Sequence, residues 1–294
     1  MAASPLSAPA RLRALLQQDG MIVAPGAYDA WSARMVEKAG FSCLYMTGYG
    51  VSASTLGRPD IGLVTMKEMA ETARNINQAV DIPVIADADD GYGSSLNVIR
   101  TVKEYELAGI AGIQLEDQAF PKRCGHMENK QLIPKEDMVA KIRAVVHARK
   151  NPDTVILART DARAVNGFDD AIDRARAYHE AGADVIFFEA PESVEELRRV
   201  GEIFKGIPLL ANMAEGGKTP SLSRAELGEL GYTIILYPSL AIYTVTKALQ
   251  ENFALLKKEE NNTPCMANSV DFHTFNKMIG LPEMRDLESS FTIK

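Results

Sequence analysis

Eight short runs of apolar residues recur along the chain and constrain its fold more than any other feature. They span residues 21–25, 43–48, 83–89, 112–117, 155–161, 184–190, 208–213 and 233–238. Near-continuous apolar runs of this length are typical of strands buried on both faces of a parallel sheet. Segments with helical spacing separate them, at 30–39, 66–79, 95–108, 135–149, 168–181, 194–204 and 223–230. Eight strands that alternate with helices predict an α/β fold, a closed (β/α)8 barrel of the TIM type.

A doubly wound open sheet is the alternative architecture. Such a sheet, where it binds a dinucleotide, carries a glycine-rich fingerprint after its first strand, and this chain has none there. No break in composition divides the repeated units, so we expect one catalytic barrel domain over residues 1–260. The remaining residues, 261–294, hold more apolar side chains than a solvated tail needs. We expect this tail to be helical and to pack on the barrel or on a neighbouring subunit.

The composition excludes several classes of partner. The 39 acidic residues outnumber the 32 basic ones, so a net charge of −7 leaves no general basic surface for nucleic acid. No apolar run approaches the roughly 18 to 20 residues that a membrane-spanning helix needs. Three cysteines without paired spacing, Cys43, Cys124 and Cys265, indicate a reducing compartment rather than a disulfide framework. We therefore expect a cytoplasmic protein without nucleic-acid or membrane partners.

Residues 1–18 are open to two interpretations. They contain Arg11 and Arg13 among small residues and no acid, a faint similarity to an organelle transit segment, which would place the protein in an organellar matrix. The other interpretation is a short tail followed by a helix. Strong Arg/Ser periodicity is lacking and the segment runs straight into the first strand, which favours the tail and helix.

Acidic residues collect where the predicted strands end, which in such a barrel is where the active site lies. The strand ends carry Asp87, Asp89, Glu116, Asp117, Arg159, Asp161, Glu189 and Asn212. Asp87 and Asp89 stand two residues apart, so both carboxylates face the same side of an extended strand. A divalent cation would relieve their repulsion, and oxygen ligands suit Mg²⁺ or Mn²⁺. The alternative is that these acids only cap helix N-termini.

One cysteine lies in a charged loop that contains glycine. The loop spans residues 120–130, and the positively charged neighbours of Cys124 in it are Lys122, Arg123, His126 and Lys130. Positive neighbours lower the pKa of a thiol and hold its proton ready for transfer. We interpret Cys124 as a reactive thiol, whereas Cys43 begins a predicted strand and is typical of a small core residue.

Four motifs together resemble the isocitrate lyase and phosphoenolpyruvate mutase superfamily over residues 20–260. In order, they are Asp87-Ala-Asp89 with Gly91-Tyr-Gly93, Glu116-Asp117-Gln118, Pro121-Lys-Arg-Cys-Gly-His126, and Ala158-Arg-Thr-Asp161. The Lys-Arg-Cys-Gly-His element is specific to the lyase side of the superfamily. That side includes 2,3-dimethylmalate and 2-methylisocitrate lyases, and the resemblance extends to proteins called carboxyvinyl-carboxyphosphonate phosphorylmutase.

The resemblance implies a metal site and a substrate site. Asp87 would bind Mg²⁺ directly, and metal-bound waters would be held by Asp60, Asp89 and Glu116. Thr47, Gly48 and Tyr49 would bind the carboxylate of an oxo acid, partly through backbone N–H groups. Other substrate-binding positions would be Tyr28, Asp87, Gly125, Arg159, Glu189, Asn212 and Pro238. The catalytic set would be Cys124, Arg159, Lys122, His126 and Glu189.

The implied reaction is a Mg²⁺-dependent cleavage of a carbon–carbon bond in a small 2-hydroxydicarboxylate, with Cys124 as general acid. A loop over 122–130 would close over the substrate, and C-terminal helices would be exchanged within a homotetramer, a dimer of dimers. Met127-Glu128 stands where methylisocitrate lyases carry an arginine, which favours a dicarboxylate such as a methylated malate.

Three other functions stay open. Oxaloacetate hydrolases of the superfamily carry a serine where this chain has Pro238, although Ser239 is adjacent. A carboxyphosphonoenolpyruvate phosphonomutase would fit the resemblance but not the thiol. A barrel that has lost catalysis and only binds an acid or a partner would have lost metal carboxylates or thiol, and all are present.

Overall fold

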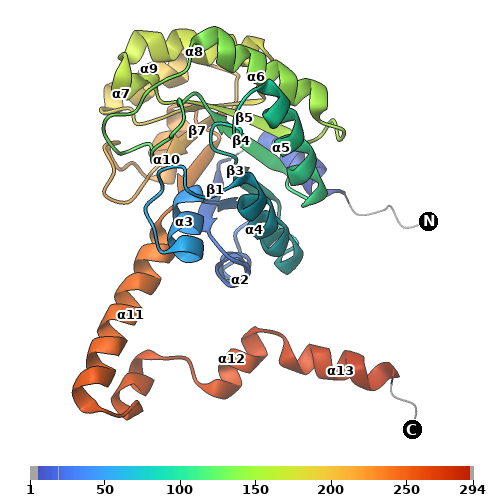
Figure 1. Ribbon diagram of the computed structural model, residues 1–294, viewed down its shortest axis with the longest axis vertical. Coiled ribbons are helices and arrows are strands. Elements are labelled where there is room, and N and C mark those ends of the chain that lie inside the picture. The colour runs from blue at the N-terminus through green and yellow to red at the C-terminus, as the bar shows by residue number, and fades with distance from the viewer. Residues whose placement is uncertain (1–5, 19, 292–294) are drawn as a thin grey trace. The chain divides into compact units, whose positions relative to one another are not determined.

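The computed structural model describes residues 6–18 and 20–291, and its central element is a closed barrel of eight parallel strands in chain order (Figure 1). The strands are β1 (Ile22–Ala27), β2 (Leu44–Met46), β3 (Val84–Asp87), β4 (Gly112–Glu116), β5 (Val155–Thr160), β6 (Val185–Phe188), β7 (Leu209–Asn212) and β8 (Ile234–Tyr237). The first and last strands pair in parallel, with Ile22 opposite Ile234, which closes the barrel. The predicted (β/α)8 architecture is confirmed.

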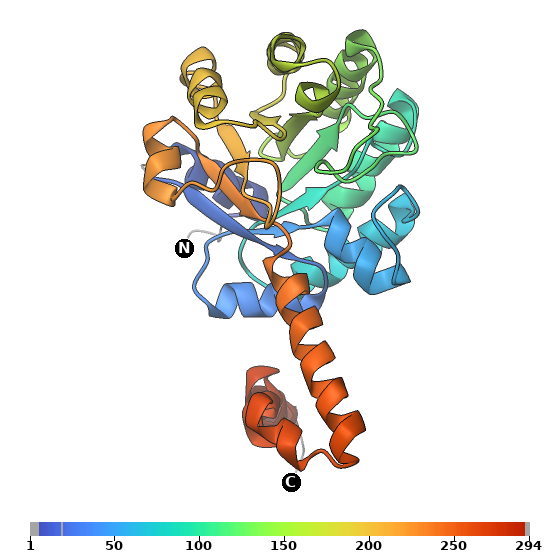
Figure 2. The ribbon, with the colours of Figure 1, turned by 90° about the vertical axis from the view of Figure 1, so that its left-hand side faces the viewer.

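Seven helices follow the predicted segments and surround the strands, as Figure 2 shows. They are α2 (Ala30–Lys38), α4 (Met66–Ala79), α5 (Ser95–Leu107), α6 (Lys135–Ala148), α8 (Phe168–Glu180), α9 (Val194–Ile203) and α10 (Arg224–Glu229). Local sequence defines their ends. Thr65 and Glu68 form a capping box that starts α4, and Gly109, with φ of 85°, makes the left-handed turn after α5.

Alternate residues of each strand face the barrel interior. The interior cluster contains Ile22, Tyr45, Ile85, Leu157, Val185, Phe187, Leu210 and Leu236. Residues of the opposite parity, such as Ile113 and Ile156, join a second cluster with the surrounding helices. The same alternation continues to the carboxyl ends of the strands, so Asp87 faces inward like Ile85, and Arg159 like Leu157. The fold thus directs these polar side chains to one place.

An additional helix, α1 (Ala8–Gln17), packs against the interior cluster. Its Leu12 is fully buried in that cluster, and Arg13 forms an ion pair with Asp184 at 2.9 Å. These contacts support the interpretation of residues 8–17 as a packed helix rather than part of a transit segment; residues 1–5 lie outside the described part. Cys43 is fully buried in the same cluster, as predicted for a core residue.

Two other helices were not expected from the sequence. They are α3 (Gly48–Leu56), directly after β2, and the single turn α7 (Ala162–Val165), directly after β5. The glycine-rich start of α3 and the shortness of α7 hide the helical period in the sequence. Both begin at the carboxyl end of a strand, so α3 presents its N-terminus to the region of the predicted site.

The chain divides into two compact units, Met1–Ile242 and Tyr243–Lys294. The division falls near the start of α11 (Leu240–Glu259) rather than after residue 260. Beyond α11, the second unit contains a 3-10 turn (Thr263–Asn268), α12 (Phe272–Met278) and α13 (Leu281–Phe291), so the predicted tail is helical. Its exposed apolar side chains include Leu249, Phe253, Phe272, Met284, Leu287 and Phe291. Within the described residues, no helix combines the length and apolar character needed to cross a membrane.

Candidate active site

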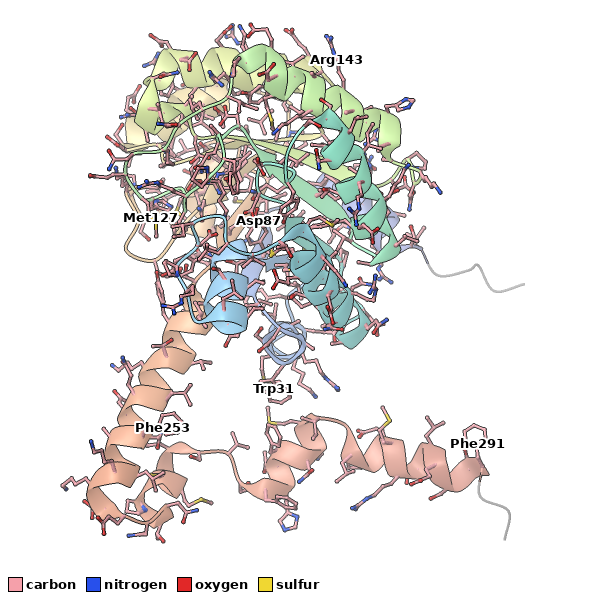
Figure 3. All side chains as sticks on the ribbon, viewed as in Figure 1. Trp31, Asp87, Met127, Arg143, Phe253 and Phe291 are labelled. Atoms are coloured by element: carbon pink, nitrogen blue, oxygen red, sulfur yellow. The ribbon has the colours of Figure 1, made fainter. Side chains whose placement is uncertain are left out.

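Four buried carboxylates gather at the carboxyl ends of β3 and β4. They are Asp60, from the loop after α3, with Asp87, Asp89 and Glu116. Figure 3 labels Asp87 within the barrel unit and Met127 on the loop that follows β4. Each of the four residues is at most 7% exposed, so their charges require internal partners.

Lys122 supplies one of these partners. Its Nζ lies 2.6 Å from Asp60 Oδ1 and 2.6 Å from Asp89 Oδ1, and its side chain is almost fully buried. Burial raises the pKa of Asp89 to about 7, with Lys122 acting to lower it and the charges of Asp87 and Asp60 to raise it. Lys122 thus forms ion pairs with two of the predicted metal-site carboxylates, whereas we expected it to act on the thiol of Cys124.

Asp87 is held by an interior chain of hydrogen bonds. Its Oδ1 accepts from the backbone N–H of Asp89 at 3.0 Å and from Gln114 Nε2 at 3.1 Å. The Gln114 Oε1 accepts in turn from the Tyr45 hydroxyl at 2.6 Å. Neither Gln114 nor Tyr45 was predicted as a site residue, because both lie below the strand ends from which the site was predicted. The signal for Gln114 was present: it is an amide in the middle of a fully buried strand, two residues before Glu116.

The other oxygen of Asp87 faces the N-terminus of α3. A Cβ at Gly48 would lie 2.6 Å from Asp87 Oδ2, so only glycine leaves this space open. Thr47 caps the helix, since its Oγ1 accepts from the N–H of Gly50 at 3.3 Å. The first N–H groups of a helix have no partner within the helix and attract anions. Thr47, Gly48 and Tyr49 therefore form a suitable place for a carboxylate beside Asp87.

The donor set fits a magnesium ion. Within the described residues, Glu116 Oε1 is buried and accepts no hydrogen bond, and the space beside Gly48 leaves Asp87 Oδ2 approachable. Among residues 6–18 and 20–291, no group of three or more His, Cys, Asp or Glu side chains is arranged to hold a metal ion by itself. Magnesium keeps several waters and binds few protein oxygens directly, so Asp87 Oδ2 and Glu116 Oε1 are the oxygens that would serve it.

Arg159 lies among carboxylates on the neighbouring strand. Its Nε and Nη2 donate to the two oxygens of Asp161 at 2.9 and 3.0 Å, and Nη1 lies 3.2 Å from Glu116 Oε2. Nη2 is also 4.0 Å from Glu189 Oε1. Although burial lowers the pKa of Arg159, the charges of Asp161, Glu116 and Glu189 raise it further, so the guanidinium stays positive. A fixed cation here can stabilise negative charge on a ligand oxygen.

Cys124 lies in the loop after β4, and its backbone N–H donates to the Asp60 carbonyl at 3.3 Å. Burial raises the pKa of its thiol above the usual value, and the backbone N–H of His126 and the charge of Arg159 lower it only in part. Our expectation that loop cations lower this pKa is wrong, because Lys122 and Lys130 pair with carboxylates. The thiol is therefore protonated at neutral pH, as a proton donor must be.

His126, Glu189 and Asn212 form a connected group at the ends of β6 and β7. His126 Nε2 lies 3.2 Å from Glu189 Oε1, and Asn212 Nδ2 donates to the same carboxylate at 3.2 and 3.3 Å. The N–H of Lys218 donates to His126 Nδ1 at 3.2 Å, so Nε2 carries the proton that faces Glu189. Gly125 also belongs here, since a Cβ on it would overlap Glu189 and Arg159.

Two predicted positions have other surroundings. The backbone N–H of Tyr28 donates to Ser32 Oγ, and the Tyr28 side chain packs under Gly50. Pro238 follows β8, where its carbonyl closely approaches Gly26. The contacts described for these two residues are thus with Ser32, Gly50 and Gly26.

The fold and this site together define a class: a (β/α)8 barrel enzyme whose carboxylate-lined active site lies beneath a thiol-bearing loop. The chain belongs to the phosphoenolpyruvate phosphomutase family, whose model matches residues 12–257. It is 51% identical to the 2,3-dimethylmalate lyase of Eubacterium barkeri, over 96% of this chain and 97% of that protein. It is 45% identical to a 2-methylisocitrate lyase of Halalkalibacterium halodurans, over 85% and 82%. The predicted superfamily and the enzyme class, carbon–carbon lyase, are confirmed.

Solved structures agree with this membership. A 2,3-dimethylmalate lyase crystal structure superposes with a TM-score of 0.92 at 40% identity, covering 98% of this chain and 96% of that one. An oxaloacetate acetylhydrolase with 3,3-difluorooxalacetate gives a TM-score of 0.92 at 33% identity, with 97% of each chain covered. A phosphonopyruvate hydrolase in complex with oxalate and Mg²⁺ gives 0.88 at 30% identity, over 97% and 99%.

Proposed function

We propose that this protein is a Mg²⁺-dependent lyase that cleaves a 2-hydroxydicarboxylate of the 2,3-dimethylmalate type to pyruvate and a saturated carboxylic acid. The observation that carries the proposal is the place of Cys124 in a loop whose backbone lies against Arg159 and Glu189; burial raises the pKa of its thiol, which favours the protonated form. Carbon–carbon cleavage leaves a carbanionic carbon that must be protonated, and a buried neutral thiol suits this step. Hydrolysis or phosphoryl transfer does not require such a donor.

Asp87 would hold the metal, and Asp60, Asp89 and Glu116 would hold its waters. Bound Mg²⁺ would act as a Lewis acid toward the carboxylate and hydroxyl oxygens of the substrate. The Mg²⁺ in the related phosphonopyruvate hydrolase and the buried oxygen donors at the ends of β3 and β4 support this assignment. Lys122 would offset the remaining negative charge of Asp60 and Asp89.

The residues of the chain would divide the remaining work. Thr47, Gly48 and Tyr49 would bind the C1 carboxylate at the N-terminus of α3. The C2 hydroxyl would lose its proton to water, and Arg159 would stabilise the negative C2 oxygen, which becomes the carbonyl oxygen of pyruvate as the C2–C3 bond breaks. The electron pair of that bond passes toward the second carboxylate, and the Cys124 thiol protonates C3.

The second carboxylate would lie toward the remaining predicted residues. Its place would be near His126, Glu189 and Asn212, whose hydrogen-bonded arrangement borders the loop. His126 and Asn212 would hold Glu189 in place through hydrogen bonds, and Arg159, whose Nη2 lies 4.0 Å from Glu189 Oε1, would offset its charge as an anionic substrate approaches. Tyr28 and Pro238 would contribute to the wall of the pocket only.

A dicarboxylate is favoured over a tricarboxylate. Met127 and Glu128 follow His126, so the loop offers an apolar and an acidic side chain where a third carboxylate would need a cation. Pro238 provides no hydroxyl for a hydrolase at the position where the resemblance expects a serine, although Ser239 is adjacent. Oxaloacetate hydrolysis and phosphonate chemistry are therefore the alternatives to test.

Pyruvate release from 2,3-dimethylmalate, 2-methylisocitrate and oxaloacetate, each with Mg²⁺ and with chelator, tests the proposal. We expect Mg²⁺-dependent pyruvate from 2,3-dimethylmalate, measured by coupled reduction. Acetate and oxalate from oxaloacetate would identify a hydrolase instead. Turnover that persists without metal would contradict the metal assignment, and failure with all three substrates would direct the assay to phosphonopyruvate.

The assembly and compartment are also part of the proposal. We infer a cytoplasmic homotetramer in which the exposed apolar side chains of Tyr243–Lys294 are buried against a neighbouring copy. Exposed phenylalanines are costly in water, and Phe253, Phe272 and Phe291 are each more than 60% exposed in the single chain. Sedimentation of the intact chain and of a variant that ends after α11 would test it.

A further inference from the structure

Lys130 anchors the far end of the loop that carries Cys124. Its Nζ donates to Asp161 Oδ1 at 2.7 Å and to the carbonyl oxygen of Gly125. The Lys130 side chain is 1% exposed and that of Asp161 is 0% exposed, so the ion pair is shielded from water. Lys130 therefore connects the loop backbone next to Cys124 with the end of β5.

Asp161 is shared between the loop and the arginine. Its Oδ1 accepts from both Lys130 Nζ and Arg159 Nη2, while Oδ2 accepts from Arg159 Nε at 2.9 Å. Both carboxylate oxygens of Asp161 therefore accept hydrogen bonds, and this one side chain holds Lys130 of the loop and Arg159 of the site in place. The two positive charges lower the pKa of Asp161 despite its burial, which keeps it ionised.

A rigid base holds Asp161 in place. Its backbone N–H donates to Asp117 Oδ1 at 2.9 Å. Asp117 is completely buried, and its other oxygen accepts from Thr160 Oγ1 at 2.7 Å and from the Tyr178 hydroxyl at 2.8 Å. A charge-assisted network of this kind resists displacement, so Asp161 is a fixed point for whatever binds it.

The loop and Arg159 also touch directly. A Cβ at Gly125 would overlap Arg159 Nη2 and Glu189 Oε1, so the loop backbone lies against both side chains. If Lys130 released Asp161, Gly125 and Cys124 would lose their tether on the side of β5. The tether on the other side, between Lys122 and the carboxylates, would remain.

We propose that Asp161 and Lys130 are positioning residues that act as one device: Asp161 orients Arg159 and, through Lys130, holds the Cys124 loop closed over the site. The carboxylate of Asp161 thereby aligns both Arg159, which stabilises negative charge on the substrate, and Cys124, which supplies the proton. The catalytic meaning of this device rests on the proposed function. The closed state of the loop is independent of the proposed function, because it can be measured without turnover.

The first experiment measures alkylation of Cys124 by iodoacetamide in the substrate-free protein, with the label located by mass spectrometry. Lys130→Met removes the tether while keeping a side chain of similar length. The matched control is Lys135→Met, which removes a surface lysine paired with Asp173 at 2.6 Å. One charge-assisted hydrogen bond corresponds to about 10- to 100-fold in an equilibrium constant, so labelling of Lys130→Met should accelerate by about that factor. Labelling equal to that of the control would overturn the proposal.

The second experiment tests whether Lys130 acts through Asp161. Asp161→Asn keeps the shape and removes the charge, and the double variant leaves neither a buried cation nor a buried anion unpaired. We expect the double variant to label no faster than the faster single variant, because both changes release the same tether. Additive effects would show that the two residues act separately and would contradict the shared device. Circular dichroism of each variant checks the fold.

Turnover distinguishes the two halves of the proposal. Lys130→Met leaves both Arg159 bonds to Asp161, so it should lower kcat with KM little changed. Asp161→Asn disturbs Arg159 as well and should lower kcat and raise KM for the substrate of the wild-type protein. Identical kinetic effects in the two variants would contradict the role of Asp161 in orienting Arg159. Failure of the lyase assignment would appear instead as wild-type protein without turnover and with the labelling pattern intact.

Discussion

The amide of Gln114 donates to Asp87 Oδ1 at 3.1 Å from the interior of the barrel. Tyr45 fixes the orientation of that amide, because its hydroxyl donates to Gln114 Oε1 at 2.6 Å. Asp87 is therefore oriented by Gln114, its register partner on the neighbouring strand β4, with Tyr45 fixing that amide, and its second oxygen is presented to the N-terminus of α3. Groups that orient a metal ligand in this way commonly set the affinity for the metal.

Gln114→Met should weaken metal binding. The substitution keeps the volume but removes the donor to Asp87, and loss of such an orienting group costs about 10- to 100-fold in affinity. Titration with Mn²⁺ followed by electron paramagnetic resonance measures this directly. The exposed Gln131, changed to Met, is the matched control, and equal Mn²⁺ affinity in the two variants would refute the role of Gln114.

Cys124→Ala should abolish most of the turnover without unfolding the protein. Loss of a positioned general acid lowers kcat by about 10²- to 10⁴-fold. Cys265→Ala is the control, because Cys265 lies in the 3-10 turn of the other unit, where its thiol donates to the Asn252 carbonyl. Steady-state kinetics on the best substrate compares them. Wild-type kcat in Cys124→Ala would eliminate the thiol as the acid.

The pH dependence of turnover should follow the raised pKa of the Cys124 thiol. Burial raises this pKa above the ordinary value for a cysteine, so the protonated donor persists through neutral and mildly alkaline pH. Since the active form is the protonated one, kcat should fall only as the pH rises through the thiol pKa. A kcat profile that falls between about pH 6 and about pH 8 would indicate a different acid, or a lowered thiol pKa.

Leu12→Ala should destabilise the barrel. Leu12 is fully buried in the interior cluster and lies against Gly112, where a Cβ would come within 3.0 Å of its Cδ2. Truncating a buried leucine costs about 2–5 kcal/mol of unfolding free energy. Urea denaturation measures the change, and Leu6→Ala, at a position that is 60% exposed, is the control. A difference under about 1 kcal/mol between them would mean that α1 does not seal the barrel.

Much of the barrel follows from local sequence. The run at 155–161 became β5 (Val155–Thr160), and the segment at 66–79 became α4, because period and capping residues act over a few neighbours. The helix α3 was missed because Gly48 and Gly50 obscure its period, and it is stabilised by its cap and by packing on Tyr28. The helix α3 matters for the site because it directly follows β2 and places its N-terminus beside Asp87. The prediction of site residues from the strand ends anticipated this only in part.

The gathering of Asp87, Asp89 and Glu116 was predictable, since the carboxyl ends of parallel strands meet at one end of a barrel. The carboxylates that pair with the loop cations could not be predicted in the same way. Lys122 and Lys130 are near Cys124 in sequence, yet they bind Asp60, Asp89 and Asp161, and the thiol pKa is raised rather than lowered. A buried ammonium pairs with whichever carboxylate the fold brings within reach, and that carboxylate can be distant in the chain.

The sequence alone therefore determined the barrel, the family and the set of chemical groups at the strand ends, because strand and helix periods and motif spacing are local properties. The tertiary structure decided how these groups are paired. Gln114 orients Asp87 from the neighbouring strand β4, and Asp161 joins Arg159 to Lys130 across 31 residues of chain. Burial decides these pairings, since removing charges from water makes each one depend on the partner that folding places beside it.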